Sequence, residues 1–196
     1  SEIYIKNNHI RGANNDTLQG PVSGVILNSS TGNLDNSTIC GNEIYDFRTY
    51  GVYIANAGNN ITIGHPTDAL NGNKFYQRAV RGTQYAVIIT SGSGHIVANN
   101  SFYNYPGVRH TSAGYGVYVS NNVNNVKILK NSFGGSNSTR GGNAYWVNTA
   151  YYGINFSGGN IATSYIEENK MANFYITGNN LFNGIYVGSG KVNIKN

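Results

Sequence analysis

Two short patterns of hydrophobic and polar residues alternate along the whole chain. The first pattern is a hydrophobic residue, two variable residues, an asparagine, one variable residue and a second hydrophobic residue, as in residues 97–102. One copy keeps only its second half, residues 73–75. The asparagines of the six copies are Asn8, Asn42, Asn73, Asn100, Asn131 and Asn169. A pattern that recurs in this way is typical of repeat architectures.

The second pattern is a small residue followed by valine or isoleucine and a short alternating strand. It reads Gly-Val-Tyr-Val at residues 116–119, and its other copies begin at residues 24, 51, 86, 153 and 184. The two patterns interleave without exception, and each recurs on average every ~32 residues, within the range of stacked-repeat folds. No window carries the apolar spacing of an amphipathic helix. The chain is therefore predicted to be all-β.

Each repeat is predicted to form one rung of a coil of parallel strands. Two short strands point alternate residues inward, and the asparagine turn joins one sheet to the next. Asparagine amides at equivalent turns are expected to stack as a ladder, because an aliphatic residue there would leave buried backbone polar groups unpaired. The prediction is a single domain, residues 1–196, of about six rungs. Residues 172–183 fit either an extra strand or a loop hairpin.

These patterns, such as Tyr-Gly-Val-Tyr-Val at residues 115–119, resemble the repeats of right-handed parallel β-helices. Such repeats occur in pectate lyase-like proteins, phage tailspikes and large bacterial surface proteins. The resemblance covers nearly the whole chain and implies the fold. It is unspecific for function, since the architecture serves polysaccharide lyases, hydrolases, epimerases, adhesins and fibres. It also implies an extracellular location, or one on a cell or virion surface.

Composition narrows the chemistry further. Only 11% of the residues are charged, and Cys40 is the single cysteine, so no internal disulfide is possible and a structural thiol is expected. The four histidines have no metal-ligand spacing, and neither a metal nor a cofactor is expected. The sequence contains neither a transmembrane run nor a signal-peptide pattern. The net charge of +5 favours general attraction to polyanions, without a specific nucleic-acid module.

The carboxylates give little support for an enzyme. Lyases that resemble this fold use clustered acids for Ca²⁺ and a basic residue for proton removal, and no such cluster is present, so no catalytic residue is assigned. Asp46, with Arg48 beside it, is the best single candidate. A solvated loop carboxylate paired with arginine is the commoner situation. If the chain is an enzyme, a polysaccharide lyase or a glycoside hydrolase is the expected class.

All six arginines fall between an asparagine turn and the next copy of the second pattern. In a stacked coil these segments lie above one another, which predicts a stripe of arginines interleaved with tyrosines. Such a face suits an acidic polysaccharide, although arginine also favours loops for the simple reason that it avoids strand interiors. The residues of this predicted face are Arg11, Arg48, Arg78, Arg81, Arg109, Arg140, Tyr50, Tyr76 and Tyr105.

The two ends of the sequence, residues 3–7 and 192–196, occupy the same phase of the repeat. No amphipathic cap is recognisable at either end, although solenoids normally need polar caps. The chain is therefore expected to be a segment of a longer solenoid or a subunit that stacks on copies of itself. The favoured function is that of a non-enzymatic extracellular structural solenoid. The alternative is a polysaccharide-binding or polysaccharide-cleaving β-helix that uses the arginine and tyrosine face.

Overall fold

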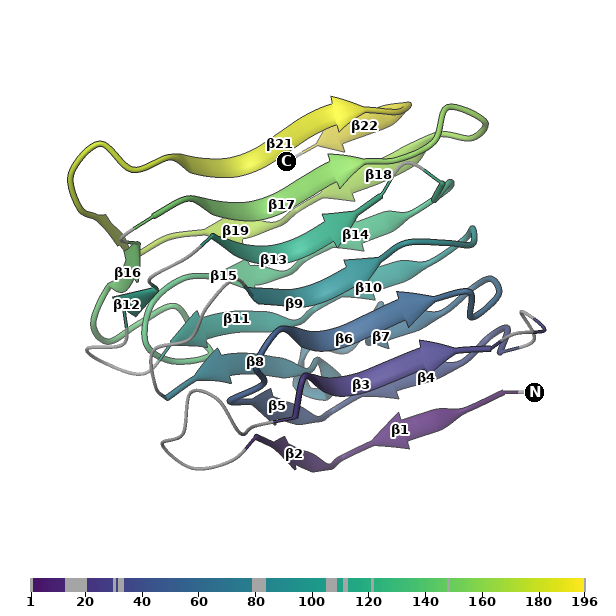
Figure 1. The fold of residues 1–196 in the computed structure, drawn as a ribbon, viewed down its shortest axis with the longest axis horizontal. Helices are drawn as coiled ribbons and strands as arrows, with labels where there is room; N and C mark the ends of the chain where they lie inside the picture. The colour runs from purple at the N-terminus through teal and green to yellow at the C-terminus, as the bar shows by residue number, and fades with distance from the viewer. Residues whose placement is uncertain are drawn as a thin grey trace.

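The computed structural model describes residues 2–12, 21–29, 31, 34–78, 84–104, 109–110, 113–120, 122–147 and 149–195. The chain forms a column of parallel strands, which Figure 1 shows stacked from β1 and β2 in purple to β21 and β22 in yellow. Three sheets form the walls of the column, and a fourth, smaller sheet lies beside it. The predicted all-β parallel β-helix is confirmed.

The strands of the walls are short and follow one another around the coil. In spatial order, sheet A contains β1 (Tyr4–Lys6), β4 (Thr38–Cys40), β7 (Thr62–Gly64), β10 (Ile96–Ala98), β14 (Lys127–Leu129), β18 (Ser164–Glu167) and β22 (Val192–Lys195). Sheet B contains β2 (His9–Arg11), β5 (Glu43–Tyr45), β8 (Lys74–Gln77), β11 (Ser101–Asn104), β15 (Ser132–Phe133) and β19 (Lys170–Met171). Sheet C contains β3 (Ser23–Asn28), β6 (Tyr50–Ala55), β9 (Gln84–Ile89), β13 (Gly114–Val119), β17 (Tyr151–Ser157) and β21 (Phe182–Ser189).

The coil makes about five turns, slightly fewer than the six rungs expected. Sheets B and C each hold six strands, and six stacked strands are separated by five steps. The repeat count of the sequence therefore equals the number of strands in sheets B and C rather than the number of complete turns. A single 3-10 turn, η1 (Ala69–Asn71), interrupts the described part of the chain where the third asparagine pattern is incomplete.

Aliphatic and aromatic side chains stack in continuous columns inside the coil. In sheet B, Phe75, Phe102 and Phe133 are paired in register, and their rings stack at centroid distances of 5.1 and 4.6 Å. In sheet C, the aliphatic residues of the second pattern pair from rung to rung. Members of that column are Val25, Val52, Val87, Val117, Ile154 and Ile185. The predicted stacking of residues one repeat apart is thus observed.

The small residue of the second pattern is required by the atoms packed against it. Gly116 and Val117 are both buried, whereas the flanking Tyr115 and Tyr118 lie half-buried on the outer face. Because two successive side chains face inward, a Cβ atom on Gly116 would approach the ring of Phe133 to 2.5 Å. Glycine at this position therefore makes room for the aromatic column of sheet B.

The corner between sheets A and B is held by the asparagine ladder. In five of the six copies the residue before the asparagine has a positive φ, as for Gly41 and Asn99, which turns the chain sharply between the strands. At each step, the backbone N–H and Nδ2 of one asparagine both donate to Oδ1 of the next. For Asn73 and Asn100 these distances are 3.0 and 2.9 Å. The described ladder runs from Asn8 through Asn42, Asn73, Asn100 and Asn131 to Asn169.

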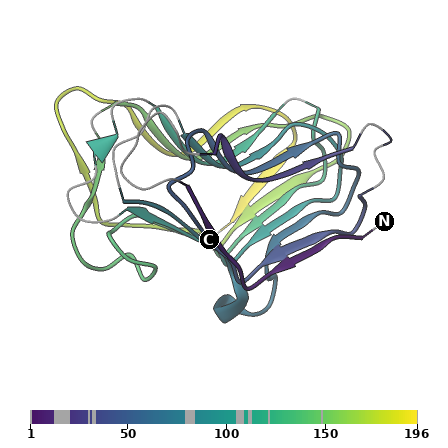
Figure 2. The same ribbon diagram turned by 60° about the horizontal axis from the view of Figure 1, so that its bottom comes forward.

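A fourth parallel sheet, sheet D, lies outside the main coil. Its strands are β12 (Arg109–His110), β16 (Tyr145–Val147) and β20 (Phe174–Ile176). Tyr145, Val147 and Tyr151 form a second apolar cluster with Phe174 and Phe182. The long connections of the later rungs form a lobe beside the coil in Figure 2. Of the two alternatives for residues 172–183, the extra strand is correct, because β20 pairs in register with β16.

Candidate functional site

Asp46 does not have the solvated environment expected from the sequence. Its side chain is only 3% exposed, and its partner is Arg78 of the next rung rather than the neighbouring Arg48. Oδ1 accepts the backbone N–H of Arg78 at 2.9 Å, and Oδ2 accepts its Nε–H at 2.8 Å. The hydrogen-bonded carboxylate raises the pKa of Arg78. Both oxygens of Asp46 therefore bond Arg78, and the pair links two rungs.

Arg78 also covers a column of tyrosines on the outer face of sheet B. Its guanidinium carbon lies 4.7 Å from the centroid of the Tyr45 ring. Tyr45, Tyr76 and Tyr103 stack in that order at centroid distances of 4.7 and 4.9 Å. Arg11 is the register partner of Tyr45 in the first rung. Burial raises the pKa of Tyr76, so this phenol stays neutral.

The structure places the other residues of the predicted face in several different positions. Tyr50 lies on sheet C, where it is the register partner of Tyr85. Arg48 lies between β5 and β6, and its backbone N–H donates to the carbonyl of Pro21. Arg140 instead contacts Ser132, at the start of β15. Arg81 and Tyr105 lie outside the described residues, as does the side chain of Arg109. Arg78 is in contact with the tyrosine column through the ring of Tyr45.

Tyrosine rings in the middle of the outer columns have both faces covered by neighbouring rings. On the outer face of sheet C, Tyr85 stacks on Tyr115 at 4.5 Å and Tyr115 on Tyr152 at 5.0 Å. A ring held between two others at this spacing has both faces covered, so it cannot also stack on a sugar ring. Carbohydrate binding by this face stays a prediction, and the rings of Tyr76 and Tyr115 cannot take part in it through their faces.

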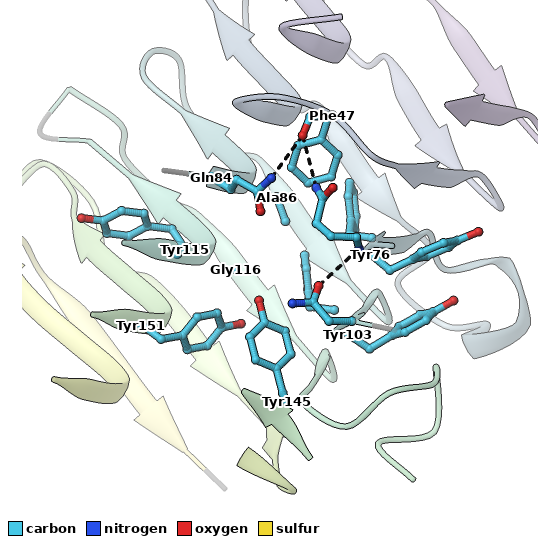
Figure 3. Close-up of a pocket in the computed structure, with 14 residues that line it drawn as sticks. Phe47, Tyr76, Gln84, Ala86, Tyr103, Tyr115, Gly116, Tyr145 and Tyr151 are labelled. Atoms are coloured by element: carbon cyan, nitrogen blue, oxygen red, sulfur yellow. Dashed lines mark hydrogen bonds between the residues drawn. The ribbon is translucent and has the colours of Figure 1, made fainter. Parts of the chain in front are cut away.

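The interior pocket next to sheet D is too small for an organic ligand. Figure 3 shows Tyr145 and Tyr151 pointing toward one another, while Tyr76 and Tyr103 point away from the pocket. Gln84 donates to the carbonyl of Phe47 on the opposite side. The cavity measures about 20 Å³, which is room for roughly one water molecule. We interpret it as a small gap in the packing between the coil and the lobe.

A second acidic side chain, Glu43, also contacts the next rung. Glu43 accepts a hydrogen bond from Lys74 Nζ at 2.8 Å, and this contact lowers the pKa of Glu43. His9 Nδ1 approaches the other carboxylate oxygen to 3.4 Å. No group of three histidine, cysteine or acidic side chains that could hold a metal is found in the described part of the chain. Cys40 is buried and unpaired in sheet A.

The last rung exposes apolar side chains whose counterparts below are buried. Ile154 and Phe156 of β17 are fully buried, whereas their partners in β21, Ile185 and Val187, are 37% and 39% exposed. The ladder of the described residues ends nearby at Asn169, whose side chain donates back to the carbonyls of Ile128 and Glu167. Sequence reasoning anticipated open ends from the missing caps, but it did not identify these side chains.

Stacked parallel strands, internal side-chain columns and an amide ladder define a β-solenoid repeat protein. A scan against protein-family models found no match, and searches of curated proteins and of solved structures also found none. No helix among the described residues is long and apolar enough to span a membrane.

Proposed function

We propose that this chain is a structural β-solenoid that associates end to end, with the first rung of a second copy placed on its last rung. The observation that carries the proposal is the half-exposed apolar surface of Ile185 and Val187 on β21. Equivalent side chains in the lower rungs are covered by the next strand. A further rung placed on β21 would bury Ile185 and Val187 in the same way.

The two ends of the ladder are complementary. At every described step, the lower asparagine donates its backbone N–H and Nδ2 to Oδ1 of the asparagine above. The top of the ladder therefore offers donors at Asn169, and the bottom offers Oδ1 of the exposed Asn8. Asn8 of a second copy placed one step above Asn169 would continue the same bonding once β22 leaves the edge of β18, where β1 of that copy has to pair. Contacts of this head-to-tail kind propagate without closing into a ring.

The proposal can be tested by the association of the purified chain. Sedimentation velocity over a range of concentrations, with electron microscopy, is expected to detect weak association into short rods. The double substitution Ile185→Lys with Val187→Lys places two charges on the open rung and is expected to keep the chain monomeric. Leu70→Lys with Ile161→Lys is the matched control, because both residues are exposed on the side of the column.

Two outcomes would contradict the proposal. One is a chain that stays monomeric at every concentration, and the other is a control pair that abolishes association as completely as the β21 pair.

An extracellular or virion-surface location is also part of this proposal and rests on the resemblance of the repeats. The non-enzymatic assignment is supported by the engagement of Asp46 and Glu43 in contacts between rungs.

A further inference from the structure

A basic groove crosses the outer face of sheet B, on the side of the asparagine corner. Its main hollow measures about 500 Å³, and an adjoining hollow of about 350 Å³ extends it toward the last rung. The floor consists of residues in register on successive strands, Lys74, Ser101, Ser132 and Lys170. With strands ~4.8 Å apart, the two lysines of this column are about 14 Å from each other. The groove therefore follows the axis of the column over four rungs.

Both walls of the groove are fixed by hydrogen bonds of their own. One wall is η1, which projects from the coil in Figure 2 and is capped by Asp68, whose Oδ1 accepts the N–H of Leu70 at 2.8 Å. The other wall is the loop of residues 136–142. Asn137 Oδ1 accepts three hydrogen bonds within that loop, from the backbone N–H groups of Thr139 and Gly141 and from the Thr139 hydroxyl. Ser101 also donates to the carbonyl of Ser138, which ties the loop to the floor.

The charge of the lining is strongly positive. Four cationic side chains line the two hollows, Lys74, Lys130, Arg140 and Lys170, against one carboxylate, Glu168. Lys74 is paired with Glu43 at 2.8 Å, whereas Lys130 lies 3.8 Å from Glu168, and both members of that second pair are about half exposed. An exposed pair at this distance is weak and can exchange its partner for an anionic ligand. Lys130 can therefore bind an anion, and Lys170 is exposed in the same hollow on β19.

The remaining lining residues indicate the kind of anion. Four hydroxyl side chains line the groove, Ser101, Ser132, Ser138 and Thr139, with the amide of Asn99. No aromatic ring is among the lining residues, so bases of a nucleic acid would have no stacking platform. Ala69 and Leu70 are the apolar side chains of the lining, so an acidic peptide would find little apolar surface to cover. Hydroxyls and cations together match a polymer that carries both hydroxyl and acidic groups.

We propose that this groove binds an acidic polysaccharide, with carboxylate or sulfate groups on Lys130 and Lys170 and sugar hydroxyls on the serines of the floor. The site is separate from the arginine and tyrosine face predicted from the sequence, since it lies at the opposite end of the sheet B strands and shares only Arg140 with that set. It is also distinct from the apolar surface of Ile185 and Val187 on β21, although Lys170 lies on β19, the edge strand of sheet B.

The test uses three labelled polymers with one backbone: dextran, carboxymethyl-dextran and dextran sulfate. Fluorescence anisotropy at low salt is expected to detect binding of one or both charged polymers and none of dextran, with binding weakened by added salt. Lys130→Gln with Lys170→Gln is expected to weaken binding roughly tenfold, which corresponds to about 1.4 kcal/mol. Lys127→Gln with Lys191→Gln removes the same charge elsewhere and is expected to change binding less than about twofold.

The charged polymers distinguish the two sources of the anionic group, because one carries carboxylates and the other sulfates. Binding of neither charged polymer, or equal loss in the two double variants, would overturn the proposal, since equal loss means diffuse surface charge. Tighter binding of a labelled oligothymidylate than of either polymer would assign the groove to nucleic acid instead. Circular dichroism of each variant establishes that the fold is intact.

Discussion

At the residue scale, the corner between sheets C and A alternates buried apolar and polar side chains. Ile61 and Val126 alternate with Ser37, His95 and Ser164, and all five are completely buried. Each polar member accepts a backbone N–H from the rung below, as Ser164 Oγ does from Val126 at 3.0 Å. His95 accepts the N–H of Ile61 through Nδ1, so its proton must be on Nε2, which then donates to the carbonyl of Ser91. A second proton on His95 would be carried by Nδ1, so this N–H would point at the backbone N–H of Ile61.

This geometry predicts a pH-dependent stability. Burial lowers the pKa of His95 below its ordinary value of 6.5. A lowered folded pKa gives stability that is fully present above pH 6.5 and is lost as the pH falls through the folded value. His95→Ser retains a hydrogen-bond acceptor, as the serines of the corner do. It is expected to lower the free energy of unfolding by about 1–3 kcal/mol and to remove the pH dependence of stability below pH 6.5. Thermal unfolding from pH 8 to pH 5 measures it.

The control for this experiment is His9→Ser, because the His9 ring is mostly exposed in the first rung. This variant is expected to keep the steep loss of stability below pH 6.5. Parallel curves for the wild-type chain and His95→Ser would show that His95 is not the group responsible.

At the element scale, the asparagine corner is a single hydrogen-bonded unit rather than a set of independent turns. Asn100 in the middle of the ladder accepts two bonds from Asn73, and its Nδ2 donates to the carbonyl of Ile63 at 2.9 Å and to Asn131. Asn8 at the bottom is exposed, and its side chain donates to Lys6 and to Asn42. Asparagine is therefore expected to contribute more to the free energy of unfolding in the buried middle of the ladder than at its exposed bottom.

Asn100→Leu is expected to destabilise the fold by about 3–5 kcal/mol, because three buried polar groups each lose a hydrogen bond. These groups are the backbone N–H of Asn73, its Nδ2 and the carbonyl of Ile63. Asn8→Leu is the matched control and is expected to cost less than about 1 kcal/mol, since water replaces the lost bonds. Urea unfolding of both variants gives the comparison, and equal losses would contradict a cooperative ladder.

At the scale of the whole molecule, the last strand, β22, occupies a position that a second copy would need for end-to-end stacking. β22 covers the edge of β18 in sheet A, whereas sheets B and C end at β19 and β21. A second copy that placed its β2 on β19 and its β3 on β21 would need its β1 on β18, where β22 already lies. β1 and β22 carry the same phase of the repeat, so they are equivalent strands.

Deletion of residues 192–196 is therefore expected to strengthen end-to-end association by at least tenfold in the dissociation constant, because it frees all three sheet edges at once. Sedimentation velocity of the shortened chain against the full chain measures the change. The Ile185→Lys and Val187→Lys pair introduced into the shortened chain is expected to abolish the gain. Unchanged or weaker association after the deletion would contradict the competition between β1 and β22.

Much of the architecture could be predicted because its contacts repeat with the sequence. Two interleaved patterns were sufficient to predict parallel stacking, the inward columns and the asparagines that share a corner. The candidate site was predicted less well. The pairing of Asp46 with Arg78 instead of Arg48, and the stacking of tyrosines that covers their faces, depend on which side chains meet between rungs.

The sequence by itself determined the fold, since hydrophobic periodicity and the asparagine turns act within one repeat and are copied in the next. Only the tertiary structure decided where the long connections lie, including the fourth sheet built from β12, β16 and β20. It also decided that lysines from separate repeats line one groove. The physical reason is that connections of unequal length set the alignment of side chains from different rungs, and this alignment exists only once the strands are paired.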